Sequence, residues 1–96
     1  MSIRVVFRAA ANHDIDDAFA WYERQQVGLG DRFVKALGMV VERIRMNPEA
    51  YTCVRGVIRR AILPRFPYLL FYVAEAERIV VIACLHASRD PRRWPT

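Results

Sequence analysis

The sequence predicts an α+β domain of the order β-α-α-β-β-β, with a helical hairpin packed on one face of a mainly antiparallel twisted sheet. Apolar residues recur at helical spacing in two segments of the N-terminal half, and a short glycine-containing turn separates them. Strand-like apolar runs dominate the C-terminal half. A chain of 96 residues, 54% hydrophobic and 26% charged, is typical of one globular domain. We therefore expect residues 1–96 to form a single domain.

The N-terminal half predicts one strand and two helices. Residues 3–7 are a short β-rich run, and residues 9–26 carry an apolar stripe at helical spacing. Residues 27–30 (Val-Gly-Leu-Gly) form the turn, and a second stripe over residues 31–46 ends before an Asn-Pro pair. The first stripe comprises Ala11, Ile15, Ala18, Phe19 and Tyr22, and the second comprises Phe33, Leu37, Val40, Val41 and Ile44.

The C-terminal half predicts three strands after a loop at residues 49–56. The strands cover residues 57–63, 68–74 and 78–86, with connections at 64–67 and 75–77. Residues 87–96 have no periodicity and form an irregular tail.

Both faces of the last two strands are apolar, which is unusual for an antiparallel sheet with one wet face. In residues 78–86, strict alternation puts Ile79, Val81, Ala83 and Leu85 on one face and Val80, Ile82, Cys84 and His86 on the other. Two helices cover only one face of a sheet. The second face therefore either meets a partner or is shielded by strong twist and the C-terminal tail.

The excess positive charge lies in the second half of the chain. The net charge is +5, because residues 1–50 hold seven basic and seven acidic groups and residues 51–96 hold eight arginines against three acids. Lys35 is the only lysine. Arginine binds phosphate and carboxylate groups bidentately, so this half favours an anionic partner such as nucleic acid or an acidic protein segment. The alternative is that the arginines only confer solubility.

Cysteine usage and hydropathy predict a cytoplasmic protein without cofactors. Cys53 and Cys84 form no CxxC pair and require no disulfide. The N-terminus lacks a signal peptide, and the longest apolar run is too short to cross a membrane. The chain has no phosphate-binding glycine loop or zinc-type spacing. His13 and Asp17 share a helix face, but two ligands are too few for a metal site.

Histidine, arginine and tyrosine residues at the predicted strand ends form the candidate chemical site. His86 ends a strand and Arg89 follows it, while Arg65 and Tyr68 border the preceding strand. A histidine beside an arginine suits metal-free RNA cleavage, because the imidazole can transfer a proton and the guanidinium can stabilise phosphate charge. The alternative is a structural histidine.

Adjacent Arg59 and Arg60 lie within one predicted strand. Their side chains must therefore point to opposite faces of the sheet, so they cannot share one site.

Six short segments, spread in order over nearly the whole chain, carry a family resemblance. They are residues 18–23 (AFAWYE), 28–33 (GLGDRF), 47–51 (NPEAY), 59–60 (RR), 66–68 (FPY) and 85–94 (LHASRDPRRW). Through these segments the chain resembles the RelE/ParE superfamily of type II toxin–antitoxin toxins, and most closely its ParE-like branch. The β-αα-βββ fold of that superfamily agrees with the order predicted from periodicity.

The resemblance implies a toxin neutralised by a small cognate antitoxin. Antitoxin tails in this superfamily are commonly acidic and lie over the toxin's sheet and helical hairpin, where they would also cover the second apolar face. The expected antitoxin contacts are Arg59, Arg60, Leu70 and Tyr72.

The resemblance also implies two possible targets. ParE-like members poison DNA gyrase, and the terminal HxxR-D-P-R-x-W pattern is usual among them; its expected target contacts are Arg89, Arg92, Arg93 and Trp94. RelE-like members instead cleave mRNA on the ribosome, for which His86, Arg89, Arg65 and Tyr68 are the candidate catalytic residues. The near absence of lysine and the tryptophan in place of a catalytic tyrosine favour gyrase. A second alternative is an inactive module that retains only antitoxin binding.

Overall fold

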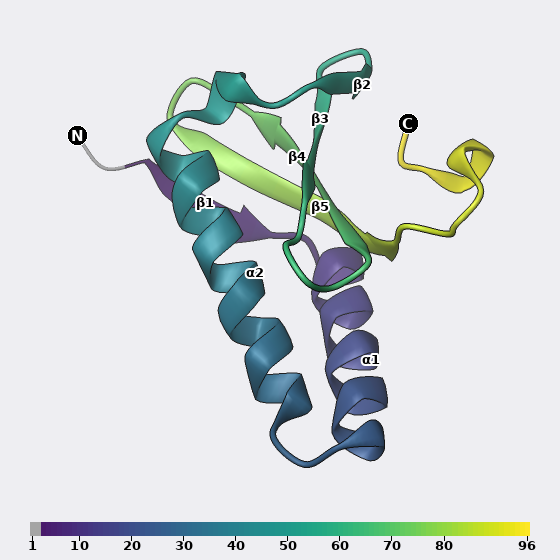
Figure 1. The fold of residues 1–96 in the computed structure, drawn as a ribbon. Helices are drawn as coiled ribbons and strands as arrows, with labels where there is room; N and C mark the ends of the chain where they lie inside the picture. The colour runs from purple at the N-terminus through teal and green to yellow at the C-terminus, as the bar shows by residue number, and fades with distance from the viewer. Residues whose placement is uncertain (1–2) are drawn as a thin grey trace.

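A helical hairpin and one mixed sheet make up the computed structural model, which describes residues 3–96 (Figure 1). The strands are β1 (Arg4–Phe7), β2 (Cys53–Arg55), β3 (Ile58–Ile62), β4 (Tyr68–Ala74) and β5 (Arg78–His86). The helices are α1 (Ala9–Gln25) and α2 (Leu29–Met46), with short 3₁₀ turns η1 (Pro48–Ala50) and η2 (Pro91–Arg93). The sheet order is β1-β5-β4-β3-β2, with β1 parallel to β5 and the other neighbours antiparallel. The predicted α+β class is confirmed.

Two local predictions need correction. The segment 49–56, predicted as a loop, includes the end of η1 and the whole edge strand β2, which is too short to show any periodicity. The second helix begins at Leu29 rather than at residue 31. The Glu23 carboxylate accepts hydrogen bonds from the backbone N–H groups of Gly28 and Gly30, both at 2.9 Å, and so stabilises the N-terminus of α2.

The helical hairpin covers one face of the sheet and forms the main core with it. Both helices lie on the same side of the sheet (Figure 1), and their apolar stripes pack against β4 and β5. Burial of these side chains removes several large apolar groups from water, including Phe33, Leu70 and Tyr72, which are all fully buried. The core therefore comes from long-range packing of the predicted stripes.

A β-bulge in β5 reverses the predicted alternation of its second half. Tyr72 pairs with Val81 and the preceding Phe71 pairs with Ala83, so Ile82 is an extra residue in the ladder. Side chains that follow the bulge therefore change face. Cys84 packs in the helix-facing core, not on the second face where strict alternation placed it. His86, two residues further along β5, lies on the same helix-facing side as Cys84.

The second face of the sheet holds a smaller core, and the C-terminal tail covers part of it. Buried residues from β3, β4 and β5 cluster there, and the partly buried Trp94 packs against them. The chain after β5 turns back toward β2 and β3, as the yellow segment in Figure 1 shows. Shielding by the tail, one of the two alternatives from the sequence, is thus present. Over residues 3–96, no helix is long and apolar enough to cross a membrane.

Candidate functional site

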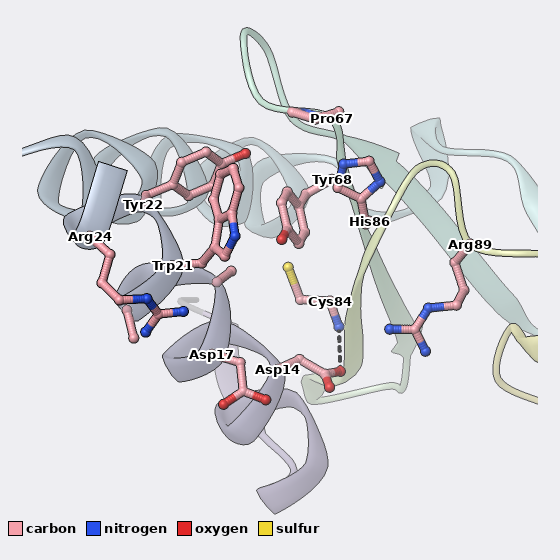
Figure 2. A pocket seen from close by; sticks show the side chains of 12 residues that line it. Asp14, Asp17, Trp21, Tyr22, Arg24, Pro67, Tyr68, Cys84, His86 and Arg89 are labelled. Carbon is pink, nitrogen blue, oxygen red and sulfur yellow. Dashed lines mark hydrogen bonds between the residues drawn. The ribbon is translucent and has the colours of Figure 1, made fainter. Parts of the chain in front are cut away.

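A cleft of about 650 Å³ lies between α1 and the end of the sheet formed by β4 and β5 (Figure 2). Aromatic rings from α1 and β4 lie together in it, and charged side chains lie at its sides. Its lining consists of Asp14, Asp17, Ala18, Ala20, Trp21, Tyr22, Arg24, Pro67, Tyr68, Cys84, His86 and Arg89. The cleft therefore combines apolar surface with both signs of charge.

The structure brings three of the four candidate catalytic residues to this cleft: Tyr68, His86 and Arg89. Tyr68 and His86 are cross-strand partners, and their rings meet edge to face with centroids 5.2 Å apart. Arg65, the fourth, is exposed in the β3–β4 connection with a positive φ of 69° and does not line the cleft. Burial raises the pKa of the Tyr68 phenol above its usual value, which favours the neutral hydroxyl.

The hydrogen bonds of His86 restrict its chemistry. Its Nδ1 accepts the backbone N–H of Ser88 at 3.0 Å, and the Ser88 hydroxyl lies 2.7 Å from the same nitrogen. A backbone amide can only donate, so Nδ1 must be unprotonated. When the ring is neutral, its proton is therefore on Nε2, so this nitrogen is a hydrogen-bond donor and not a base.

The wall of the cleft is fixed by a contact between α1 and the bulged part of β5. The Asp14 carboxylate accepts the backbone N–H of Cys84 at 3.0 Å, as the dashed line in Figure 2 shows. Burial, and to a smaller extent the nearby Asp14 charge, raises the pKa of the Cys84 thiol to about 12. Cys84 is therefore an unreactive part of the wall.

The predicted target contacts all lie in the C-terminal tail, residues 87–96. Arg92 is ion-paired with Asp90 (Nη2 to Oδ2, 2.7 Å), and hydrogen bonds from Arg92 hold the pKa of Asp90 below its usual value. Arg89 and Arg93 are exposed. Trp94 is partly buried, with its ring 5.3 Å from the ring of Phe71. The tail thus presents arginines outward while its tryptophan packs inward.

Arg59 and Arg60 point to opposite faces, as expected from their adjacency. The Arg59 guanidinium donates to the Tyr51 carbonyl at 2.6 Å on the helix side. The Arg60 guanidinium lies 5.7 Å from the centre of the Trp94 ring on the second face.

The other two expected antitoxin contacts lie in the interior. Leu70 and Tyr72 are both fully buried beneath the helices. The Tyr72 hydroxyl donates to the Pro48 carbonyl at 2.6 Å, and burial raises its pKa to about 12. Both side chains contribute to the core in this conformation and are inaccessible to a partner.

The sequence did not predict two residues of these regions, Trp21 and Arg55. Trp21 lies in the segment 18–23 that carries the family resemblance; it lines the cleft and is 48% exposed. A large aromatic residue three positions after Ala18, at the flank of the apolar stripe of α1, is the signal that could have found it. Arg55 lay in a predicted loop, yet its guanidinium binds the backbone of the tail.

Comparison with known proteins agrees with this architecture. A family model described as "ParE toxin of type II toxin-antitoxin system, parDE" matches residues 5–91. The chain belongs to the ParE toxin family.

Among solved structures, a chain of the "Chromosomal ParDE TA system from P. aeruginosa" superposes on this ParE family member with a TM-score of 0.67. The alignment covers 91% of this chain and 98% of the other, at 14% sequence identity, and so shows a shared fold. A search of curated proteins gives no match.

Proposed function

We propose that this ParE family toxin inhibits growth by poisoning DNA gyrase, and that a cognate ParD-type antitoxin neutralises it. The observation that supports this target is the C-terminal tail, where the exposed Arg89, Arg92 and Arg93 fall within five residues on a segment held against the sheet. A cluster of exposed guanidinium groups fits an anionic surface such as a protein–DNA complex. Trp94 serves this contact by anchoring the arginines.

The antitoxin contact is supported by the cleft. Trp21 offers exposed aromatic surface, and Arg24 and Arg89 lie at the sides of the cleft (Figure 2). Such a cleft fits a peptide segment with apolar anchors and acidic side chains. Arg89 belongs both to the cleft and to the basic tail, so an antitoxin that covers it would also block the target contact.

Purified gyrase tests the target directly. DNA supercoiling should stop at saturating toxin, cleaved DNA–gyrase complexes should accumulate, and added antitoxin should restore supercoiling. Undiminished supercoiling at saturating toxin would rule out gyrase as the target. Inducible expression without the antitoxin tests toxicity itself, because an inactive antitoxin-binding module would leave growth unchanged.

The antitoxin surface has its own test. Trp21→Ala should weaken binding of the antitoxin, whereas Met39→Ala should not, since Met39 is an exposed apolar residue of α2 outside the cleft. Equal affinities of the two variants for the antitoxin would contradict the assignment.

Endoribonuclease activity is the second candidate, favoured by the juxtaposition of Tyr68, His86 and Arg89 in one cleft. Two features weaken it: the Nδ1 of His86 is occupied by the Ser88 amide, and Arg65 lies outside the cleft. We therefore expect His86→Gln to retain growth inhibition. Loss of inhibition in this variant, together with mRNA cleavage by the unaltered protein, would favour the ribonuclease.

A further inference from the structure

We propose that Arg55 is a positioning residue, which holds the C-terminal turn η2 against the second face of the sheet and so presents the tail arginines to the toxin's target. The expected effect on the target rests on the proposed function, whereas the contact between Arg55 and the tail does not. Arg55 comes from β2, at the edge of the sheet farthest from β1.

The Arg55 guanidinium bridges two carbonyl groups of the tail. Its Nη1 donates to the Trp94 carbonyl at 2.7 Å, and its Nη2 donates to the Pro91 carbonyl. These two carbonyls stand at the two ends of η2, so one side chain fixes both ends of the turn. A planar guanidinium supplies two donors in a rigid fork, which a lysine ammonium cannot reproduce.

The turn is itself well defined, which gives the bridge something rigid to hold. Asp90 caps η2 by accepting the backbone N–H of Arg92 at 2.9 Å. The Arg92 guanidinium adds hydrogen bonds to the same carboxylate. The backbone N–H of Trp94 closes the turn on the Pro91 carbonyl at 3.1 Å.

The seat for Trp94 lies on β3 and β4. Arg60 and Phe71 are cross-strand partners on the second face, and the Trp94 ring contacts both. Packing there is incompletely satisfied, because the Nε of Arg60 and the Nε1 of Trp94 are buried without a hydrogen-bond partner among residues 3–96. Each such donor opposes docking. The hydrogen bonds from Arg55 offset this cost.

The backbone around Arg55 places its side chain on the required face. Arg55 pairs with Ile58, which belongs to the small core of the second face, and the tight turn between them includes Gly56 with a φ of 53°. Cross-strand partners point to the same face of a sheet. The three-residue strand β2 thus serves to deliver one guanidinium to the tail.

Holding the tail in one conformation before it meets its target removes an ordering cost from binding. Without the Arg55 bridge, η2 would move relative to the sheet, and the residues that connect it to β5 would have to be ordered when the target binds. Ordering the backbone of even one residue weakens binding by about tenfold. We therefore expect loss of Arg55 to reduce toxin potency by about tenfold or more while the fold remains intact.

The test compares Arg55→Met and Arg55→Lys with the control Arg4→Met, which removes an exposed arginine from β1 at the opposite edge of the sheet. For fluorescence, each change is made in a Trp21→Phe background, so that all tryptophan emission comes from Trp94. Acrylamide quenching of Trp94 should rise in both Arg55 variants and stay unchanged in the control. Circular dichroism shows whether each variant is folded. If Arg55→Met does not fold, the comparison is made with Arg55→Lys.

Potency is then measured with Trp21 intact, by gyrase inhibition and by growth inhibition in cells. Increased Trp94 quenching together with about tenfold weaker inhibition supports the proposal. Unchanged quenching overturns the tail contact, and increased quenching with undiminished potency overturns the positioning role. If the unaltered toxin does not inhibit gyrase, the proposed target fails, and growth inhibition by the same variants decides the role of Arg55.

Discussion

Gly30 in α2 makes a close contact with α1, so Gly30→Ala is expected to destabilise the toxin. A methyl group at this position would lie 2.8 Å from the Cγ of Glu23 and 2.8 Å from two ring carbons of Phe19. Contacts this short force a side chain or a helix to move, which costs about 1–3 kcal/mol in a packed site. The displaced Glu23 is also the acceptor for the N–H groups of Gly28 and Gly30.

Gly38 provides a matched control in the same helix. A methyl group built there has no heavy atom of the described residues within 4 Å. Alanine is preferred over glycine inside a helix by about 1 kcal/mol, so Gly38→Ala should stabilise the protein by up to that amount. At Gly30 the same preference offsets part of the cost of the clash, which leaves a net loss of up to about 2 kcal/mol.

Thermal or urea unfolding followed by circular dichroism measures both variants. The free energies of unfolding of the two variants should differ by up to about 3 kcal/mol, or up to roughly 15 °C in the unfolding midpoint for a domain of this size. The same glycine-to-alanine substitution would then destabilise the protein at Gly30 and stabilise it at Gly38. A Gly30→Ala variant as stable as the unaltered protein would refute the close helix–helix contact, and destabilisation by Gly38→Ala would refute the open environment assigned to it.

Three further predictions concern the wall of the cleft and the core. Asp14→Ala should lower the free energy of unfolding by about 2 kcal/mol, because a buried N–H loses its charged acceptor, whereas the exposed Asp17→Ala should change it by less than about 0.5 kcal/mol; equal effects would contradict the Asp14 contact. With a thiol reagent at pH 8, the exposed Cys53 should react rapidly and Cys84 only after denaturation, since burial raises the pKa of Cys84 to about 12; two fast thiols would contradict this. Burial raises the pKa of Tyr72 from 10.0 to about 12, so the unfolded chain releases the phenol proton at a lower pH than the folded protein does, and stability should fall as pH rises from about 10 to 12. In denaturant titrations at several pH values, Tyr72→Phe should make this fall in stability shallower. An unchanged dependence of stability on pH would count against the raised pKa of Tyr72.

Periodicity in the sequence predicted most of the secondary structure. The bounds predicted for β4 and β5 agree with the structure, and the apolar stripes of both helices pack in the core as expected. The strand β2 was missed because three residues carry no detectable period. The buried positions of Leu70 and Tyr72 were missed as well, since alternation shows that residues share a face but not which face the helices cover.

The candidate site was only partly predictable, for reasons specific to its residues. A histidine at a strand end was identifiable, but its partner Ser88 and its resulting tautomer depend on the conformation of the chain after β5. Residues of α1, such as Trp21, join the cleft only through tertiary packing. The roles of Arg55 and Arg60 depend on where the tail docks.

The sequence by itself determined the α+β class, the helical hairpin and the Arg-rich second half, because helical and strand periods and charge are local properties of the chain. Only the tertiary structure decided which residues form the site. The extra residue Ile82 in β5 changes the face of every side chain after it, and so brings His86 into the cleft beside Tyr68. A bulge of this kind depends on the register of the neighbouring strand, which no local pattern specifies. The docking of Trp94 on Phe71 depends in the same way on two segments far apart in the chain.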